Sequence, residues 1–258
     1  MPEAKMRIKI LGSFRLIKDH NVYDDEIWKS KKALQIFKYL VSQQGKKVPK
    51  DIIMELFWPD NDLDQVANLH TTIYYIRKTL DQLHKGFASC LKSSKGLYSF
   101  ESKDYCIIDI NEFDNFYNLA LNNHKEKKID KALNLYYQTI NLYQGDFLQE
   151  DLYDDWAYIL RQEYREKYID IILRTNYILS KIQEKYIEAN NICEKGLNID
   201  PYREELYRSI IYNYIKSNNY IYAIKRYKEY SKMLEQEFDL EPVQEIKELF
   251  EGLDVAAT

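Results

Sequence analysis

The chain has 258 residues, enough for two domains of ordinary size, and its 45% hydrophobic and 30% charged residues are typical of a folded, water-soluble protein. It has no run of about 18 apolar residues, and its first residues lack the apolar core of a signal peptide, so we expect a cytoplasmic protein with no membrane partner. The net charge of −4 hides an asymmetry that favours an anionic partner for the front half: residues 1–105 carry 18 Lys and Arg against 13 Asp and Glu, and residues 106–258 carry 19 against 28.

A small antiparallel sheet is predicted at the start of the chain. Apolar residues alternate along Met6–Leu11, as in a half-buried strand, and the pattern resumes at Phe14–Ile17. Lys18–Asn21 is rich in turn-forming residues, and a third short strand is expected around Val22–Trp28.

Two helices should follow the sheet. Ser30 is a suitable N-cap for the first helix, which Gly45 ends. The second runs over Pro49–Phe57, with the proline in its first turn. The residues expected to face the core are Leu34, Phe37, Leu40 and Val41 in the first helix and Ile52, Ile53 and Leu56 in the second.

A third, longer helix is predicted from Asp64 to about His84. Its apolar residues form one narrow stripe at helical spacing: Leu69, Ile73, Ile76, Leu80 and Leu83. The opposite face carries Thr71, Tyr74, Tyr75 and Lys78, flanked by Asn68, His70 and Arg77. A recognition helix needs such hydrogen-bonding and cationic side chains to meet base edges and phosphates in a major groove. An ordinary amphipathic helix with a solvated face has the same pattern, and this stretch alone favours that simpler interpretation.

A basic hairpin is predicted after the third helix. Phe87–Leu91 has the pattern of a strand, Lys92–Gly96 that of a turn, and Leu97–Phe100 that of the returning strand. Three helices followed by a hairpin with lysines at its tip are typical of a winged helix. In that fold the third helix enters the major groove and the wing touches the adjacent backbone.

The order of these elements resembles the winged helix of OmpR-type response regulators. It is still more similar to one family, the antibiotic regulatory proteins (SARP), over nearly the whole chain. The residues that carry this resemblance in the front half are Leu11–Phe14, Lys32–Leu34, Leu56–Asp60, the spacing Leu69, Ile73, Ile76–Lys78 and Leu80, and Lys95–Tyr98. In the back half, Asp109–Phe113, Tyr143–Leu148 and Trp156 with Arg161 resemble signatures of the bacterial transcriptional activation domain that follows the winged helix in this family.

The resemblance implies a transcription activator whose protomers bind tandem direct repeats and recruit RNA polymerase. Tyr74-Tyr75 departs from the family pattern, in which many members have a small or basic residue, so the base preference does not carry over.

The back half is predicted to be helical after a connector over Glu101–Ile108. Tyr186–Ala189 recurs as Tyr220–Ala223, and the two alanines are 34 residues apart, which is the tetratricopeptide (TPR) period. We expect about three irregular helix pairs, with a long helix around Asp155–Ile182 and a terminal helix near Val243–Phe250.

Stacked helix pairs leave a concave face that suits a peptide or protein surface, so partner recruitment and dimerisation are equal alternatives for this half. Its tyrosines are expected to pack between helices rather than to line a ligand groove: Tyr207, Tyr212, Tyr214, Tyr220, Tyr222 and Tyr227.

Catalysis is not expected. The sequence has no phosphate-binding glycine loop, no nucleophile elbow and no zinc-protease motif, and only seven glycines in total. Its three cysteines and four histidines lack the spacing of a metal site. We therefore predict a protein that is not an enzyme and that holds no cofactor and no metal.

The sequence thus predicts a mixed fold: an α+β winged helix-turn-helix over residues 1–105 and an all-α, TPR-like domain over residues 106–254. The predicted DNA-binding residues are Asn68, Thr71, Thr72, Tyr75, Arg77 and Lys78 on the third helix, Lys31 and Lys32 at a helix start, and Lys92 and Lys95 in the wing. The family resemblance implies a contact with RNA polymerase in the loop Trp58–Asp64, through Trp58, Asp60 and Asp62.

The predicted partners are double-stranded DNA and RNA polymerase, with a homodimer formed through the helical domain or on tandem sites. One alternative is a TPR-type protein-interaction adaptor with a degenerate winged helix. Another is the output fragment of a longer response regulator or ATPase.

Overall fold

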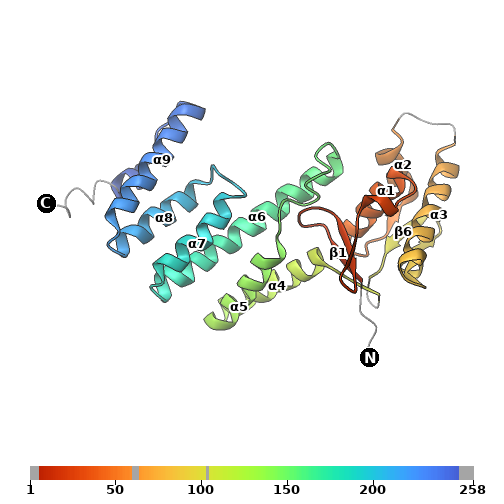
Figure 1. Ribbon diagram of the computed structural model, residues 1–258, viewed down its shortest axis with the longest axis horizontal. Coiled ribbons are helices and arrows are strands. Elements are labelled where there is room, and N and C mark those ends of the chain that lie inside the picture. The colour runs from red at the N-terminus through yellow and green to blue at the C-terminus, as the bar shows by residue number, and fades with distance from the viewer. Residues whose placement is uncertain (1–5, 60–63, 103–104, 250–258) are drawn as a thin grey trace. The chain divides into compact units, whose positions relative to one another are not determined.

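The computed structural model describes residues 6–59, 64–102 and 105–249 (Figure 1). It divides into two compact units, the first formed by Met1–Asn115 with Leu142–Glu163 and the second by Phe116–Asn141 with Tyr164–Thr258. The boundaries of these units differ from the expected division after residue 105, which stays a prediction. None of the helices in the described residues combines the length and the hydrophobicity that a membrane-spanning segment requires.

The first unit begins with a four-stranded sheet in the order β3-β2-β1-β7. Its strands are β1 (Met6–Lys9), β2 (Arg15–Lys18), β3 (Asn21–Tyr23) and β7 (Cys106–Ile108). The expected antiparallel sheet is present, because β1 pairs antiparallel with β2 and β2 with β3, although its third strand ends at Tyr23 rather than near Trp28. The expected connector Glu101–Ile108 was partly wrong, since its end forms β7, which pairs parallel with β1 and sets Ile108 opposite Ile8.

The winged-helix elements follow the first three strands. They are η1 (Asp25–Ile27), α1 (Lys31–Ser42), β4 (Val48–Pro49), α2 (Lys50–Phe57), α3 (Gln65–Leu83), η2 (Phe87–Cys90), β5 (Leu91–Ser94) and β6 (Leu97–Phe100). Ser30 caps α1 as expected, because its hydroxyl accepts the backbone N–H of Ala33. The second sheet has the order β4-β6-β5.

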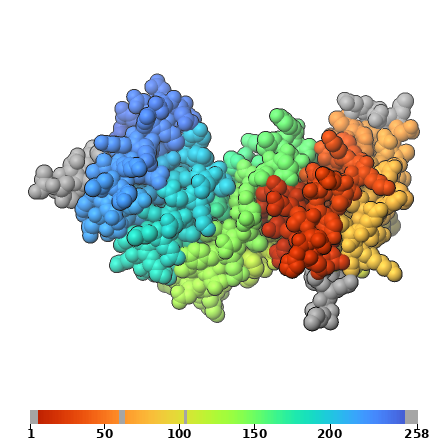
Figure 2. Space-filling model, in the orientation of Figure 1, coloured from red at the N-terminus to blue at the C-terminus, as the bar shows by residue number. Residues whose placement is uncertain are grey.

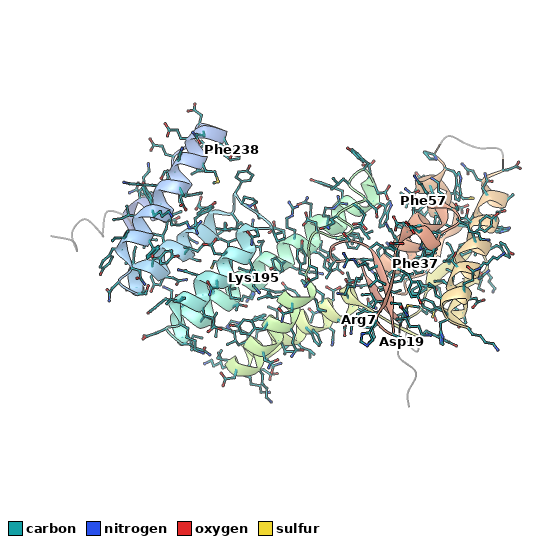
Figure 3. The ribbon with its side chains drawn as sticks, in the orientation of Figure 1. Arg7, Asp19, Phe37, Phe57, Lys195 and Phe238 are labelled. Atoms are coloured by element: carbon teal, nitrogen blue, oxygen red, sulfur yellow. The ribbon has the colours of Figure 1, made fainter. Side chains whose placement is uncertain are left out.

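An aromatic cluster centred on Phe37 holds these elements together. The Phe37 ring lies 4.9 Å from that of Trp28 and 5.2 Å from that of Phe100, measured between centroids. Figure 3 shows Phe37 in the interior of the first unit and Phe57 at the end of α2. Phe37 is fully buried, so its cluster joins α1 to the wing strand β6.

Three expectations for this region were wrong. Ile52 and Leu56 of α2 are exposed, and Phe57 is buried in their place beside Ile53, because the inward stripe of α2 is shifted by one residue from the expected one. Phe87–Cys90 is a 3₁₀ helix rather than a strand. The wing therefore starts only at Leu91, and Lys92 belongs to a strand rather than to the turn.

The second unit is helical. The helices in the chain after β7 are α4 (Asp109–Lys125), α5 (Ile129–Leu142), α6 (Asp155–Tyr177), the π-helical turn η3 (Ile178–Ile182), α7 (Tyr186–Leu197), α8 (Glu204–Lys216) and α9 (Tyr220–Phe238). The unit boundary falls within α4 and α6, and α6 with η3 covers the long helix expected at Asp155–Ile182. Residues 244–249 are also helical. The end of the expected terminal helix, Phe250, lies outside the described residues.

The two alanines that mark the 34-residue period are both buried between helices, as expected for a TPR-like repeat. Ala189 and Ala223 are both fully buried, in α7 and α9. Gly196 allows a close approach of helices, because a Cβ atom there would lie 2.7 Å from a methyl carbon of Leu206. The tyrosine prediction holds in part: the rings of Tyr207 and Tyr230 stack at 4.3 Å, while Tyr222 is exposed.

The family signatures of the back half meet those of the front half inside the first unit. The buried carboxylate of Asp109 accepts the backbone N–H groups of Ile10 and Leu11 at 2.8 and 2.9 Å. Leu11 and Gly12 form bridges with Phe147, and Leu148 donates its N–H to the carbonyl of Ile10 at 2.9 Å. Residues 146–149 thus pair with residues 10–12, in the connection between β1 and β2.

The signature pair Trp156 and Arg161 completes this assembly. The buried guanidinium of Arg161 donates to the carbonyls of Phe147, Leu148 and Asp151 at 3.1–3.3 Å. The Trp156 ring packs against Tyr39 of α1, with centroids 5.2 Å apart. Arg161 therefore fixes the conformation of residues 147–161, and Trp156 packs that segment against the winged helix.

Candidate nucleic-acid interface

The helix α3 presents the polar face that a recognition helix needs. Thr71, Tyr74 and Lys78 are exposed, and Asn68 and Tyr75 are half-buried at its edge. The stripe Leu69, Ile73, Ile76 and Leu80 is buried against the rest of the first unit, as expected. In Figure 2, α3 forms part of the surface of this unit, drawn in orange to yellow.

One predicted contact is excluded from that face. Thr72 is buried, and its hydroxyl donates to the carbonyl of Asn68, one turn earlier, at 2.8 Å. Its hydrogen-bonding group is therefore occupied inside the helix and turned from solvent. The prediction of Thr72 as an edge contact is not supported by this position, because residue 72 faces the core side of the helix.

Arg77 connects α3 to the wing. Its guanidinium donates to the carbonyl of Leu91 at 3.2 Å and to the hydroxyl of Ser93 at 2.9 Å, both in β5. The same charge partly offsets the effect of burial, which raises the pKa of the Tyr98 hydroxyl on β6. Arg77 therefore holds the helix and the hairpin in a fixed relation, and Ser93 is a residue that the sequence analysis missed.

The wing is a hairpin with a two-residue turn. Ser94 pairs with Leu97, and the turn residues Lys95 and Gly96 both have positive φ angles, 49° and 75°. This is the conformation of a type I′ turn, whose twist matches that of the strands. It leaves the side chains of Lys92 and Lys95 exposed, as a wing that contacts phosphates requires.

The two lysines at the start of α1 have different environments. Lys31 is exposed. Lys32 is half-buried and donates to the carbonyl of Phe57 at 2.8 Å, with its ammonium 5.8 Å from the ring centroids of Phe57 and Trp58. Lys32 thus closes the C-terminal end of α2, and the prediction that it binds phosphate is not supported by this position.

Two further lysines lie beside the wing. Lys50 donates its backbone N–H to the carbonyl of Gly96 at 2.8 Å, and its side chain lies along that glycine. Lys47 is exposed directly before β4, which pairs with β6. The sequence analysis missed both, although the cluster Lys46-Lys47 and Lys50 around Pro49 was a signal.

The predicted polymerase contacts are only partly within the described chain. Trp58 is half-buried under Lys32, and its carbonyl accepts from the side chain of Gln65 at 2.7 Å. Asp60 and Asp62 lie outside the described residues. Within the described chain, no group of three or more His, Cys, Asp or Glu side chains is placed to hold a metal ion.

Comparison with protein families assigns the chain. The family model described as "Bacterial transcriptional activator domain" matches residues 108–253, which is more than half of the chain. The chain belongs to this family. A second model, "Transcriptional regulatory protein, C terminal", matches residues 24–96, from η1 to the turn of the wing. The two matches confirm the combination expected from the sequence, an OmpR-type winged helix with a bacterial transcriptional activator domain, as in SARP-type activators.

The fold of this chain is similar to that of a solved structure. That structure is described as "Mycobacterium tuberculosis EmbR in complex with low affinity phosphopeptide". The TM-score is 0.78 and the sequence identity is 15%. The match covers 98% of this chain and 66% of the EmbR chain. At this identity the likeness bears on the fold alone, and it confirms the predicted winged helix followed by a helical domain. No curated protein matches the sequence significantly.

Proposed function

We propose that this chain is a sequence-specific DNA-binding activator, in which α3 occupies the major groove and the wing contacts the adjacent backbone. The observation that carries the proposal is the joint placement of the polar face of α3 and the basic wing, which Arg77 ties together. Thr71 and Tyr75, with Asn68 at the edge, are the proposed base-reading side chains. Such a rigid pair of elements reads bases and positions phosphates at once.

The proposed phosphate contacts are lysines around this pair, all exposed except the half-buried Lys50. They are Lys31, Lys78, Lys92 and Lys95, joined by Lys47 and Lys50 beside the wing. Neutralising about five phosphates gives a slope near −4.5 in log K against log salt concentration. The local excess of Lys and Arg in residues 1–105 supports this, although the whole chain is acidic.

The first experiment selects bound fragments from a random DNA pool with the full chain, and then measures the affinity for the selected duplex by fluorescence anisotropy. Lys78→Ala should weaken binding to all sequences and reduce the salt slope by about 1. Thr71→Ala should cost about 1–3 kcal/mol and change the preferred base. Lys195→Ala, at an exposed position of α7 (Figure 3), is the matched control and should change neither quantity.

Tandem binding and polymerase recruitment complete the proposal. We expect the selected motif to occur twice in the same orientation at near-helical spacing, bound by two protomers. Replacement of both Asp60 and Asp62 by alanine should leave DNA affinity unchanged and lower activated transcription by a purified bacterial polymerase. Failure to enrich any motif with folded protein would contradict the DNA-binding proposal and favour a protein-interaction adaptor.

A further inference from the structure

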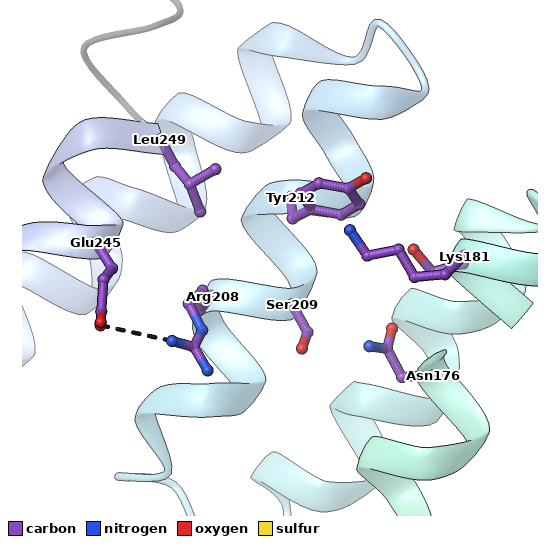
Figure 4. Close-up of a pocket in the computed structure, with 8 residues that line it drawn as sticks. Asn176, Lys181, Arg208, Ser209, Tyr212, Glu245 and Leu249 are labelled. Carbon is purple, nitrogen blue, oxygen red and sulfur yellow. Dashed lines mark ion pairs between the residues drawn. The ribbon is translucent and has the colours of Figure 1, made fainter. Parts of the chain in front are cut away.

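A cavity of about 330 Å³ lies in the second unit, apart from the proposed DNA interface. Its walls come from the end of α6 and η3, from α8, and from the helical residues 244–249 (Figure 4). The lining side chains that matter here are Asn176, Lys181, Arg208, Ser209, Tyr212 and Leu249. We call this cavity the α8 pocket. Its volume is within the range of small-molecule sites.

A lysine at one wall of the α8 pocket packs against an aromatic ring. The ammonium of Lys181 lies 3.2 Å from the ring centroid of Tyr212. No described acidic side chain forms an ion pair with it, although acidic residues are abundant in this half of the chain. A cation held over an aromatic face beside a cavity is free to meet a ligand anion.

A buried network of amide side chains orients a second hydrogen-bond donor, the NH₂ group of Asn176, toward the α8 pocket. Asn213 is fully buried and donates its amide N–H groups to the side-chain oxygens of Asn176 and Asn190, both at 2.9 Å. It accepts the hydroxyl of Ser180 at 2.6 Å. Because the amide oxygen of Asn176 is taken by Asn213, its NH₂ group faces away from the network. Figure 4 shows this nitrogen directed toward Ser209 across the pocket.

The second cation at the α8 pocket, Arg208, has only a weak ion pair. The guanidinium of Arg208 lies 3.5 Å from the carboxylate of Glu245, whose side chain is 69% exposed. An exposed pair of this kind contributes little stability and exchanges readily with a competing anion. Arg208, Lys181 and Asn176 thus supply three hydrogen-bond donors to the lining of the pocket, and Tyr212 and Leu249 supply an apolar wall.

The backbone next to the pocket is unusual as well. Ile178–Ile182 forms a π-helical turn, in which the N–H of Gln183 bonds to the carbonyl of Ile178 at 3.0 Å. Such turns are rare and occur often at functional sites. Here the turn carries both Ser180, which anchors the amide network, and Lys181.

We propose that the α8 pocket binds a small organic anion, one acidic group on an aromatic or aliphatic body. The acidic group meets Lys181, the NH₂ of Asn176 and Arg208, and the body lies against Tyr212 and Leu249. This proposal concerns only the second unit and does not depend on the proposed DNA binding.

The test uses the full chain and two fluorescent probes of similar shape, the anionic 8-anilinonaphthalene-1-sulfonate and the uncharged N-phenyl-1-naphthylamine. We expect one saturable site for the anionic probe. Lys181→Met and Asn176→Asp should each raise its Kd by about tenfold or more, because the first removes the cation and the second adds a like charge. Lys195→Met, an exposed lysine away from the pocket, should leave it unchanged.

Two controls make the result decisive. Binding of the uncharged probe should be similar in all variants, which separates loss of charge recognition from loss of the apolar wall. Far-UV circular dichroism and thermal unfolding check that each variant is folded, and Arg208→Gln replaces any variant that is not. No saturable site for the anionic probe, or equal affinity in folded Lys181→Met and Asn176→Asp, would overturn the proposal.

Discussion

Asp109 is the residue whose position most changes the interpretation of the sequence. The residue is 2% exposed, and its carboxylate accepts backbone N–H groups from Ile10, Leu11 and Ile110. Burial outweighs these bonds and raises its pKa to about 6. The side chain therefore acts as a buried bridge between α4 and the first strand.

A pH dependence of stability follows from Asp109. Its pKa is higher in the folded protein than in the unfolded chain, so the stability it contributes is fully present below about pH 4 and is lost as the pH rises to about 6. The loss is about 3 kcal/mol, from the shift in pKa. Urea unfolding of the protein and of Asp109→Asn between pH 4 and 7 measures it. The difference in unfolding free energy, wild type minus variant, should fall over this range, and a constant difference would contradict the assignment.

At the scale of elements, the wing combines a favourable strand pairing with an unfavourable turn residue. Lys95 has a φ angle of 49°, a left-handed conformation that costs a residue with a Cβ atom about 1 kcal/mol and that Asn tolerates better. A lysine at this position lowers the stability of the hairpin and places a cation at its tip. This agrees with a wing that meets phosphates.

Replacing the turn lysine should separate stability from binding. Lys95→Asn should raise the free energy of unfolding by about 0.5–1 kcal/mol, because Asn-Gly suits the type I′ turn. It should also lower DNA affinity and reduce the salt slope by about 1. Lys92→Asn, on the strand β5, is the control that should reduce the slope without the gain in stability. A variant at position 95 with unchanged affinity would remove the wing tip from the interface.

At the scale of the whole molecule, the winged helix does not complete its own core within residues 1–105. The fourth strand β7, the bridge of Phe147 to Leu11 and the packing of Trp156 on Tyr39 all come from later residues. The buried ammonium of Lys38 also depends on Asp151, at 2.8 Å. Removing one partner of such a pair costs about 3–5 kcal/mol.

Truncation should expose this dependence. A fragment of residues 1–105 should show no cooperative thermal transition, whereas a fragment of residues 1–163, which retains every segment of the first unit, should unfold cooperatively. Near-UV circular dichroism during heating distinguishes the two. If the fragment of residues 1–105 unfolded like the full chain, residues 1–105 would be an independently stable domain, and the dependence on residues 106–163 would be contradicted.

The elements of the winged helix could be predicted from the sequence because their signals are local. Helical spacing placed α3 within one residue, Ser30 marked the start of α1, and the 34-residue period of Ala189 and Ala223 reported the helical repeat. Wrong expectations arose where one residue of shift changes a face, as with Ile52 and Leu56. The 3₁₀ helix at Phe87–Cys90 was mistaken for a strand because a short apolar run fits both.

The sequence by itself therefore determined the family, the order of elements and the polar face of α3, since all three depend on spacing along one helix or strand. Only the tertiary structure decided which of these side chains are exposed and which are held by contacts within the protein. Arg77 bonds to the wing, Lys32 to the end of α2, and Asp109 to the residues after the first strand. The partners in these hydrogen bonds are 14 to 99 residues apart in the sequence. Contacts over such separations leave no periodic trace in the sequence, because they depend on how the completed elements pack.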